Sequence, residues 1–355
     1  MTLMSYLGAI GAAQREAMDA DERVIIIGED VEANVYGTTG GASKSRAAEG
    51  DFLQRYGRQR IRNTPISEES IVGAAAGAAM TGLRPIVDLS YSSFLYMAMD
   101  QLVNQVAKNR YMFGGQATLP VVFRSAMFYG LSTGAHHSDR PYPMFMNVPG
   151  LKIIAPASPA DAKGLLRSAV DSDDPVLSFE ACLLWGMKEE VDEEEYRIPL
   201  GIGRTVRSGS DVTVVGVSNA VVEAAAAADA VAAEGISVEV FDPRTLVPLD
   251  VEGILGSVRR TGRLVVADPA HRTCSAASEI AAIVAEHAFE SLTSPIVRVT
   301  TPDMQIPFSP VLEKQMYPNR VSIEAAIRRV LGVPKGGLPE SARPAPALSP
   351  NPGDS

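Results

Sequence analysis

The segment Asn63-Thr64-Pro65-Ile66-Ser67-Glu68-Glu69-Ser70 joins a predicted strand to a predicted helix, and it decides how the first half of the chain folds. Pro65 disfavours a helical conformation at the residue before it, so we expect the chain to enter the segment extended. Ser67 can then cap a helix by accepting a backbone N–H. The next ten residues, 71–80, are small and apolar, which is typical of a helix that packs closely against another element. Glu68 is therefore predicted at a strand-to-helix junction, where a rigid scaffold often presents a functional side chain.

The local sequence also allows a plainer role for this carboxylate. Glu68 and Glu69 both fall in the first turn of the predicted helix, where acidic side chains complement the positive end of the helix dipole. The local sequence alone favours this second role. The motifs in the rest of the chain, described below, favour the functional role of Glu68.

Composition and charge limit the classes of protein to consider. The chain has 355 residues, which suggests two domains, and its 46% hydrophobic and 21% charged residues are ordinary for a globular protein. The net charge of −10 argues against nucleic acid as a partner. No apolar run is long enough to span a bilayer, and the N-terminus lacks the pattern of a signal peptide. We therefore expect a soluble, cytoplasmic protein without a membrane partner.

The cysteines and histidines indicate neither a disulfide framework nor a zinc site. Cys182 and Cys274 are far apart in sequence, and no other cysteine is present. The four histidines do not combine with them into a zinc pattern: His136, His137, His271 and His287.

The first half of the chain alternates between strand and helix patterns. Strands are predicted at 24–27, 60–62, 84–89, 119–124, 151–155 and 176–179. Helices are predicted at 3–19, after Ser67, at about 94–111 and at 159–170. Such alternation favours an α/β fold with a parallel sheet that is covered on both faces. The segment 34–50 is predicted to be a mobile loop, and the segment 125–143 a polar loop that holds His136 and His137. The acidic segment 188–195 is predicted to be a solvated linker.

A second, smaller α/β series follows. Strands are predicted at 211–217, 237–241, 263–267 and 296–299, and helices at 220–234, 251–258 and 276–287. From residue 334 the chain is rich in Pro, Gly and Ser without apolar periodicity, which predicts a disordered tail. The predicted organisation is a domain at 1–190, a linker at 191–205, a domain at 206–332 and a tail at 333–355.

A series of short motifs resembles one known family over residues 3–332. The motifs stand in the order and at the spacing of that family: 64–68, Gly82-Leu83-Arg84-Pro85, Asp100-Gln101, 110–115, His137-Ser138, Pro149-Gly150-Leu151-Lys152, 161–165 and 244–250. The family is the beta subunit of thiamine-diphosphate-dependent 2-oxo acid dehydrogenases, which includes pyruvate, branched-chain and acetoin dehydrogenases. The resemblance implies a pyrimidine-binding domain followed by a transketolase-type C-terminal domain. It also implies an α2β2 heterotetramer with an alpha subunit, an active site between subunits, and a lipoyl acyltransferase core as a further partner.

The resemblance assigns roles to four residues. Glu68 matches the carboxylate that binds the N1′ atom of the cofactor's aminopyrimidine, which is general acid–base work in which the cofactor carries the difficult step. Phe94 matches the aromatic residue that packs on the pyrimidine ring. His137 matches a histidine that handles protons during decarboxylation and acyl transfer. Glu29 matches an acidic residue near Glu68, with a structural role at a strand end as the equal alternative.

One family feature of the cofactor site is missing from this chain. Related enzymes hold the diphosphate through Mg²⁺ with a Gly-Asp-Gly motif, and the sequence contains no such motif. We therefore expect the alpha subunit to hold Mg²⁺ and the diphosphate. A possible monovalent cation site, for K⁺, would use main-chain oxygens near Val121 and Ala169 together with the acidic loop that ends at Asp174.

The chain departs from the family after His137-Ser138. It reads Asp139-Arg140-Pro141-Tyr142-Pro143, where family members more often carry Gln and small residues. An arginine can hold a carboxylate with two parallel hydrogen bonds, so Arg140 and Tyr142 are candidate substrate ligands. The alternative is that Arg140 pairs with Asp139 or with solvent at the loop surface.

Three functions remain after this comparison. The first is decarboxylation of a pyruvate-like or branched-chain 2-oxo acid with acyl transfer to lipoamide. The second is an acetoin dehydrogenase beta subunit, or a biosynthetic relative that passes the acyl group to another acceptor. The third is a non-catalytic scaffold, and the combination of Glu68, Phe94 and His137 counts against it.

Overall fold

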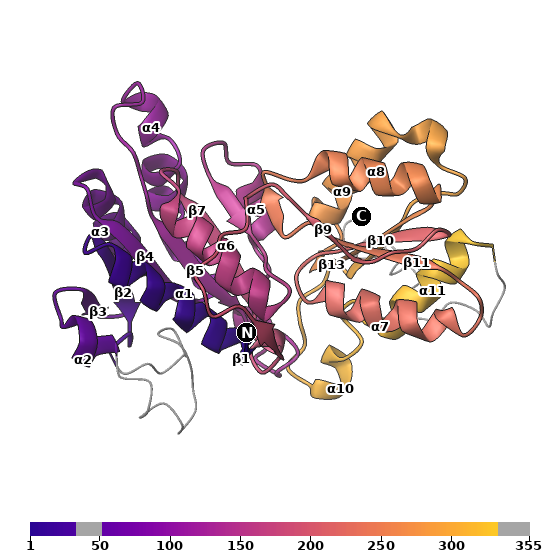
Figure 1. Cartoon of the computed structure of the whole chain (residues 1–355), viewed down its shortest axis with the longest axis horizontal. Coiled ribbons are helices and arrows are strands. Elements are labelled where there is room, and N and C mark those ends of the chain that lie inside the picture. The colour runs from indigo at the N-terminus through magenta and orange to yellow at the C-terminus, as the bar shows by residue number, and fades with distance from the viewer. Residues whose placement is uncertain (33–51, 333–355) are drawn as a thin grey trace, which may run out of the picture. The chain divides into compact units, whose positions relative to one another are not determined.

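The computed structural model describes residues 1–32 and 52–332 (Figure 1). The loop expected at 34–50 and the tail expected at 333–355 lie outside the described residues. The described chain forms two compact units. The first comprises Met1–Arg204 together with Asp242–Gly253, and the second comprises Thr205–Phe241 and the chain from Ile254 onward. The return of 242–253 to the first unit is not visible in the order of predicted elements.

The first unit is built on a seven-stranded sheet of order β12-β6-β7-β5-β4-β2-β3. All neighbouring pairs are parallel except β12 with β6, which is antiparallel. The strands are β2 (Val24–Glu29), β3 (Ile61–Thr64), β4 (Arg84–Tyr91), β5 (Val122–Met127), β6 (Lys152–Ile154), β7 (Val176–Ala181) and β12 (Thr245–Val247). The central strands are buried along most of their length, as a parallel sheet covered on both faces requires. The predicted α/β class is confirmed.

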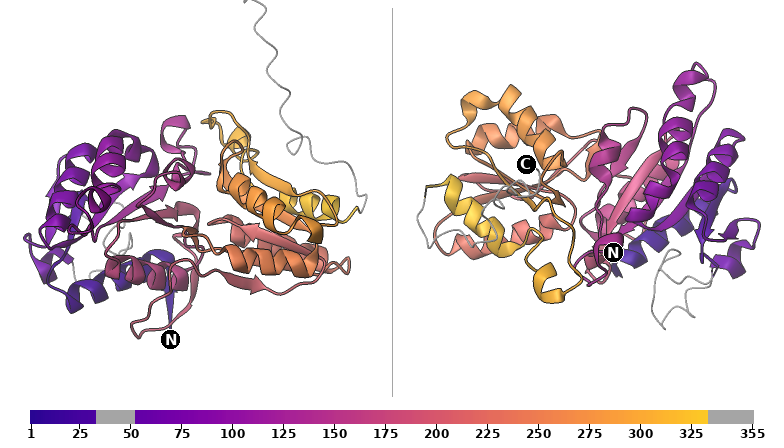
Figure 2. Two further views of the ribbon diagram at one scale, coloured as in Figure 1. Left: turned by 90° about the horizontal axis from the view of Figure 1, so that it is seen from above. Right: turned by 180° about the vertical axis from the view of Figure 1, so that it is seen from behind.

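Helices cover both faces of this sheet (Figure 2). On one face α1 (Tyr6–Ala20) packs against α6 (Pro159–Asp171), and both helices begin at a serine whose side chain accepts a backbone N–H. On the other face lies α3 (Glu68–Met80), which packs on β4. Two shorter helices, α2 (Phe52–Tyr56) and α5 (Tyr142–Met146), also belong to this unit.

The prediction of one regular helix at 94–111 is wrong, because the chain forms three helical segments of different type there. The chain forms a 3₁₀ helix, η2 (Ser92–Ala98), then a π-helix, η3 (Gln101–Val106), and then one turn of α-helix, α4 (Asn109–Met112). The spacing of apolar residues over the predicted range does not distinguish helices of different pitch, which explains the error. The junction between η3 and α4 lies close to Gly150, where a Cβ atom would come within 2.1 Å of the Ala107 oxygen.

The acidic segment 188–195 is not the solvated linker that its charge predicts. Lys188–Val191 forms strand β8, which pairs antiparallel with β1 (Thr2–Ser5), so the chain start predicted as helix is partly strand. The Glu189 carboxylate accepts the Ala160 N–H at 2.8 Å, at the first turn of α6. The buried Lys163 ammonium donates to the main-chain oxygens of 192, 193 and 194 and pairs with Glu16 at 2.8 Å. The acidic side chains and main-chain oxygens of this segment therefore stabilise the first unit.

The second unit has a five-stranded sheet of order β14-β13-β10-β11-β9. Its strands are β9 (Arg204–Arg207), β10 (Val212–Gly216), β11 (Val238–Asp242), β13 (Leu264–His271) and β14 (Val297–Thr301). Helices α7 (Ala220–Ala232) and α11 (Arg320–Val330) pack together on one face, with α8 (Val251–Thr261) and α9 (Ala276–His287) on the other (Figure 1). A short helix, α10 (Pro310–Glu313), precedes α11.

Within the described ranges, none of the helices has the length and apolar character needed to cross a bilayer.

Candidate active site

The predicted site residues follow the carboxyl ends of neighbouring strands. In the sheet register Glu29 of β2 pairs with Thr64 of β3, and Gly28 pairs with Asp88 of β4. Because parallel strands end at one edge, the segments that follow them meet there. Open α/β sheets bind ligands outside this edge, which makes it the candidate active site.

Glu68 is the first residue of α3 and is half-buried. The expected Ser67 cap is wrong, because the Ser67 hydroxyl instead donates to the Pro65 oxygen at 3.2 Å. Glu69 is exposed and accepts a hydrogen bond from Gln101 Nε2 at 3.0 Å. The two adjacent carboxylates therefore have different surroundings, as the rotation of about 100° between successive helical residues predicts.

A second carboxylate, that of Glu29, lies close enough to Glu68 to sense its charge. Burial, and then the negative charges of Asp30 and Glu68, raise the pKa of Glu29 above its ordinary value. The close approach of β2 to β4 depends on Gly28, where a Cβ atom would come within 2.4 Å of the Asp88 oxygen. Beside Glu29, the buried Thr64 hydroxyl has no hydrogen-bond partner among the described residues. Two acids and an unsatisfied hydroxyl thus mark one place at the sheet edge.

An aromatic cluster brings the β4 and β5 segments together. The rings of Phe94 and His137 lie 5.6 Å apart, and His137 also lies 4.7 Å from Tyr91. Tyr91 in turn contacts Phe128 at 4.3 Å. Phe94 is carried by η2, which packs against the helix that begins with Glu68. The cluster therefore joins two of the predicted site residues, Phe94 and His137. His136, to which the family comparison gives no role, lies 6.4 Å from Phe94.

The sequence reading missed three aromatic residues of this cluster: Tyr91, Phe128 and Trp185. Trp185 contacts Phe128 edge-on at 5.0 Å, although it comes from the segment after β7. The spacing of three residues between Tyr91 and Phe94 could have suggested that they are neighbours if the 3₁₀ helix had been recognised. No local signal connects Trp185 with the others.

Hydrogen bonds fix the loop that carries His137. The Thr133 hydroxyl donates to the Phe128 oxygen at 2.9 Å and contacts the Ser138 hydroxyl at 2.8 Å. The Ser92 hydroxyl donates to the Asp139 oxygen at 2.8 Å. The loop is therefore held both by its own residues and by η2, and His137 is presented from a supported position.

Arg140 and Tyr142 lie in the interior of the first unit. The exposed fraction of Arg140 is 4%, so the alternative that placed it at the loop surface is wrong. Its guanidinium donates to the Ser138 oxygen and lies 5.2 Å from the centre of the Tyr129 ring. Tyr142 is fully buried against Phe179. Both side chains support the loop, and their role as substrate ligands stays a prediction.

A buried ionic cluster lies beneath the aromatic residues. Arg124 pairs with Glu180 at 2.7 Å and with Asp88 at 3.3 Å, and each of the three is at most 5% exposed. Burial raises the pKa of Asp88 to about 6, against the opposing effect of Arg124. A cavity of about 10 Å³, room for one water molecule, lies beside this cluster and is also lined by Ser90 and Trp185. Three interlocked charges on β4, β5 and β7 tie together the strands that carry the site.

The proposed cation ligands lie near a loop whose acidic residue Asp174 is already paired with cationic side chains from other elements. The Val121 oxygen accepts the Val176 N–H at 3.0 Å, and the Ala169 oxygen accepts the Ser172 N–H at 3.2 Å. Asp174 forms ion pairs with Arg110 and, at 3.0 Å, with Lys152. In the described part of the chain, no cluster of three or more His, Cys, Asp or Glu side chains could hold a metal ion.

Comparison with known proteins agrees with this architecture. The family model "Transketolase, pyrimidine binding domain" matches residues 3–181, and "Transketolase, C-terminal domain" matches residues 201–323. A solved structure titled "Split gene transketolase, inactive beta4 tetramer" superposes with a TM-score of 0.75 at 22% identity, covering 93% of this chain and 99% of that one. At that identity the likeness concerns the fold.

Curated relatives cover nearly the whole chain. The acetoin:2,6-dichlorophenolindophenol oxidoreductase subunit beta of Bacillus subtilis (strain 168) is 42% identical over 94% of this chain and 98% of its own length. The 2-oxoisovalerate dehydrogenase subunit beta and the pyruvate dehydrogenase E1 component subunit beta of the same organism are each 37% identical, over 93% of this chain and 99% of their own lengths.

The two domain matches define a protein of the transketolase-like, thiamine-diphosphate-dependent class. Within that class the chain belongs to the family of beta subunits of pyruvate, branched-chain 2-oxo acid and acetoin dehydrogenases. The sheet edge fits one part of thiamine diphosphate. The unsatisfied Thr64 hydroxyl and the Glu29–Glu68 pair suit an aminopyrimidine, which offers both donors and acceptors, and Phe94 offers an aromatic face.

Proposed function

We propose that this chain holds the aminopyrimidine of thiamine diphosphate with Glu68 and works with an alpha subunit to decarboxylate a 2-oxo acid and pass the acyl group to lipoamide. The single observation that carries the proposal is the half-buried Glu68 carboxylate beside a second acid at the carboxyl edge of a parallel sheet. If Glu68 served only the helix dipole, there would be no need for a second acid, Glu29, beside it with a raised pKa.

The chain's own residues perform the proton handling in this proposal. When bound, thiamine diphosphate supplies a carbanion at its thiazolium carbon and an electron sink for the carbon that loses CO₂. The Glu68 carboxyl would bind the pyrimidine N1′ atom and would exchange a proton with it. Beside it, burial and the charges of Asp30 and Glu68 raise the pKa of Glu29, which favours the protonated form of that carboxyl more than in an ordinary glutamate. His137, supported by Tyr91 and Phe94, donates or accepts a proton at the substrate.

The proposal assigns the rest of the cofactor to a partner. Mg²⁺ and the diphosphate are held mainly by the alpha subunit, in an α2β2 heterotetramer located in the cytoplasm. The relatives are named as beta subunits, which supports the need for another chain. A lipoyl acyltransferase core then receives the acyl group.

We also propose a K⁺ site at the loop around Asp174. The main-chain oxygens of Val121 and Ala169 each accept one hydrogen bond and retain a second lone pair. The measurement is the melting temperature of the chain in KCl, NaCl and choline chloride at equal concentration. Equal melting temperatures would show that Lys152 and Arg110 alone balance this loop.

Acetoin cleavage is the second candidate, and a specific observation favours it. Two relatives that are 42% identical are named as acetoin oxidoreductase beta subunits, whereas relatives named as 2-oxo acid dehydrogenase beta subunits are 36% to 40% identical. Both reactions break a carbon–carbon bond next to a carbonyl and need the same half-site.

The test is to reconstitute the chain with its alpha subunit and to measure turnover of a panel of 2-oxo acids and acetoin with an artificial electron acceptor. Turnover of a 2-oxo acid that requires thiamine diphosphate and both chains supports the first proposal. Turnover of acetoin alone selects the second. No turnover of either substrate class by a well-assembled complex would contradict both.

A further inference from the structure

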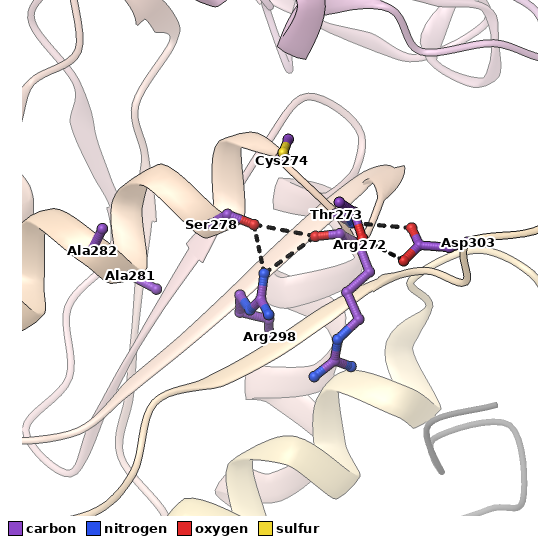
Figure 3. A pocket seen from close by; sticks show the side chains of 8 residues that line it. All are labelled: Arg272, Thr273, Cys274, Ser278, Ala281, Ala282, Arg298 and Asp303. Atoms are coloured by element: carbon purple, nitrogen blue, oxygen red, sulfur yellow. Dashed lines mark hydrogen bonds between the residues drawn. The ribbon is translucent and has the colours of Figure 1, made fainter. Parts of the chain in front are cut away.

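The second unit contains a pocket of about 700 Å³ where β13 ends and α9 begins (Figure 3). It belongs to a different unit from the sheet edge that carries Glu68, and the proposed reaction uses none of its residues. The lining residues are Arg272, Thr273, Cys274, Ser278, Ala281, Ala282, Arg298 and Asp303.

Hydrogen bonds to neighbouring residues of the pocket hold the Arg298 side chain in place. It lies on β14, and its Nη1 atom donates to the Ser278 hydroxyl at 2.5 Å and to the Arg272 oxygen at 3.2 Å. The Ser278 hydroxyl itself donates to the same oxygen at 3.1 Å. An arginine carries five N–H donors, so these contacts orient the guanidinium and leave donors for a ligand. The Arg298 guanidinium is therefore already ordered before a ligand binds.

Arg272 brings a second guanidinium to the same pocket. Its side chain is exposed, and within the described residues it has no hydrogen-bond or ion-pair partner. Figure 3 shows its side chain extending beside Arg298. The chain around it is fixed, because Asp303 accepts both the Thr273 N–H at 3.0 Å and the Thr273 hydroxyl at 2.6 Å. An unneutralised cation on a rigid turn is suited to binding an anion.

The charge of the lining is positive in a chain that is strongly negative. Two arginines face one acid in the pocket, whereas the whole chain has a net charge of −10. Burial would raise the pKa of Asp303, but the hydrogen bonds from Thr273 outweigh it and lower the pKa, so the acid stays ionised. Its oxygens are directed to Thr273 and away from the guanidinium groups (Figure 3).

We propose that this pocket binds the phosphate group of a small phosphorylated molecule, held between the guanidinium groups of Arg272 and Arg298. A phosphate monoester carries a charge of about −1.5 to −2 at neutral pH, which two guanidinium groups match better than the single charge of one carboxylate. The Ser278 hydroxyl adds a polar contact. Ala281 and Ala282 leave space beside the phosphate for the rest of the molecule.

Cys274 gives a direct readout of occupancy. It is exposed in the pocket, whereas the other cysteine of the chain, Cys182, is buried. The rate at which neutral iodoacetamide alkylates Cys274 is measured on the full chain by mass spectrometry, with inorganic phosphate or with chloride at equal ionic strength. Phosphate in the pocket slows the alkylation. Each rate ratio is taken within one variant, which removes any effect of a substitution on the thiol itself.

The variants are Arg272→Gln and Arg298→Gln, with Arg329→Gln on α11 as a control of equal charge change in the same unit. Phosphate titrated by ³¹P NMR provides an independent affinity. Each pocket variant is expected to weaken phosphate binding about tenfold or more, as the loss of a charge-assisted hydrogen bond implies, and to abolish the protection of Cys274. The control keeps wild-type values.

Three results would overturn the proposal. Phosphate could leave Cys274 alkylation unchanged in the wild-type chain. The Arg329→Gln variant could lose as much affinity as the pocket variants, which would indicate a general charge effect. Malonate at equal ionic strength could protect Cys274 as well as phosphate does, which would show a site for any small dianion.

Discussion

Replacing Glu68 by Gln separates the two roles that the sequence allows for this residue. The substitution keeps the size and hydrogen-bonding shape of the side chain and removes its ability to exchange a proton. The matched control is Glu69→Gln, one residue further along the same helix turn. Glu69 is exposed and contacts Gln101, so it shares the helix-dipole position of Glu68 without sharing its surroundings.

The expected magnitudes differ between stability and catalysis. Each carboxylate in the first turn of α3 contributes about 0.3–1 kcal/mol through the helix dipole, so both variants lose a similar, small amount of stability. Glu68 alone lies beside Glu29 at the sheet edge. Loss of a general acid–base group lowers a rate by about 10²–10⁴-fold, so Glu68→Gln should lower turnover by at least that factor and Glu69→Gln by little.

The assay is single-turnover kinetics of the chain reconstituted with its alpha subunit, with an artificial electron acceptor. Thermal melting and size-exclusion chromatography of each variant confirm that the complex still forms. Equal rates for the two variants would refute the reasoning and return Glu68 to a helix-dipole role. A loss of assembly in Glu68→Gln alone would show that the carboxylate is structural.

Three further predictions concern the scaffold. Arg124→Met leaves two buried carboxylates without their cation and should cost about 3–5 kcal/mol in urea denaturation, whereas Arg329→Met on the surface should cost little. Gly150→Ala forces a side chain onto a main-chain oxygen at a backbone φ of +101°, so its soluble yield and melting temperature should both fall. Burial and the charge of Asp161 raise the pKa of Asp242 to about 7, so this carboxyl stabilises the fold at low pH and loses that effect as pH rises. The melting temperature of the wild type should therefore fall relative to Asp242→Asn between about pH 4 and pH 7, and parallel curves would contradict it.

Periodicity predicted the regular elements because buried strands and amphipathic helices have strong local patterns. The helix predicted at 276–287 and the strand predicted at 24–27 are both present, with β2 extending to Glu29. Helix α11 was missed although Asn319 and Ser322 form a capping box at its start, a signal that the sequence contains. Strands β1 and β8 were missed because neither has a local pattern of its own. They are hydrogen-bonded to each other although almost the whole sequence of the first unit separates them.

The candidate site was predictable where a motif specified it and unpredictable where packing did. Glu68 and His137 lie in the ordered motifs, and the family resemblance adds Phe94 between them. The ionic cluster of Asp88 and Arg124 does not, because its members are spread over three strands and each alone resembles an ordinary polar strand residue. The burial of Arg140 was also unexpected, since the polar loop around it gave no sign that the guanidinium would contact the Tyr129 ring.

The arrangement of polar groups at the sheet edge lowers the stability of the fold, and folding alone gives no reason for it. Glu29 and Glu68 repel each other, and the nearby Thr64 hydroxyl is buried without a partner in the described chain. A chain selected only for stability would replace either acid or satisfy the hydroxyl. The buried cluster beneath, with Arg124 between two carboxylates, holds the strands in place despite that repulsion. The scaffold is thus complete within the chain, whereas the groups at its edge are complete only with a ligand that supplies hydrogen-bond donors and acceptors. This is the division expected of a subunit that contributes half of a cofactor site.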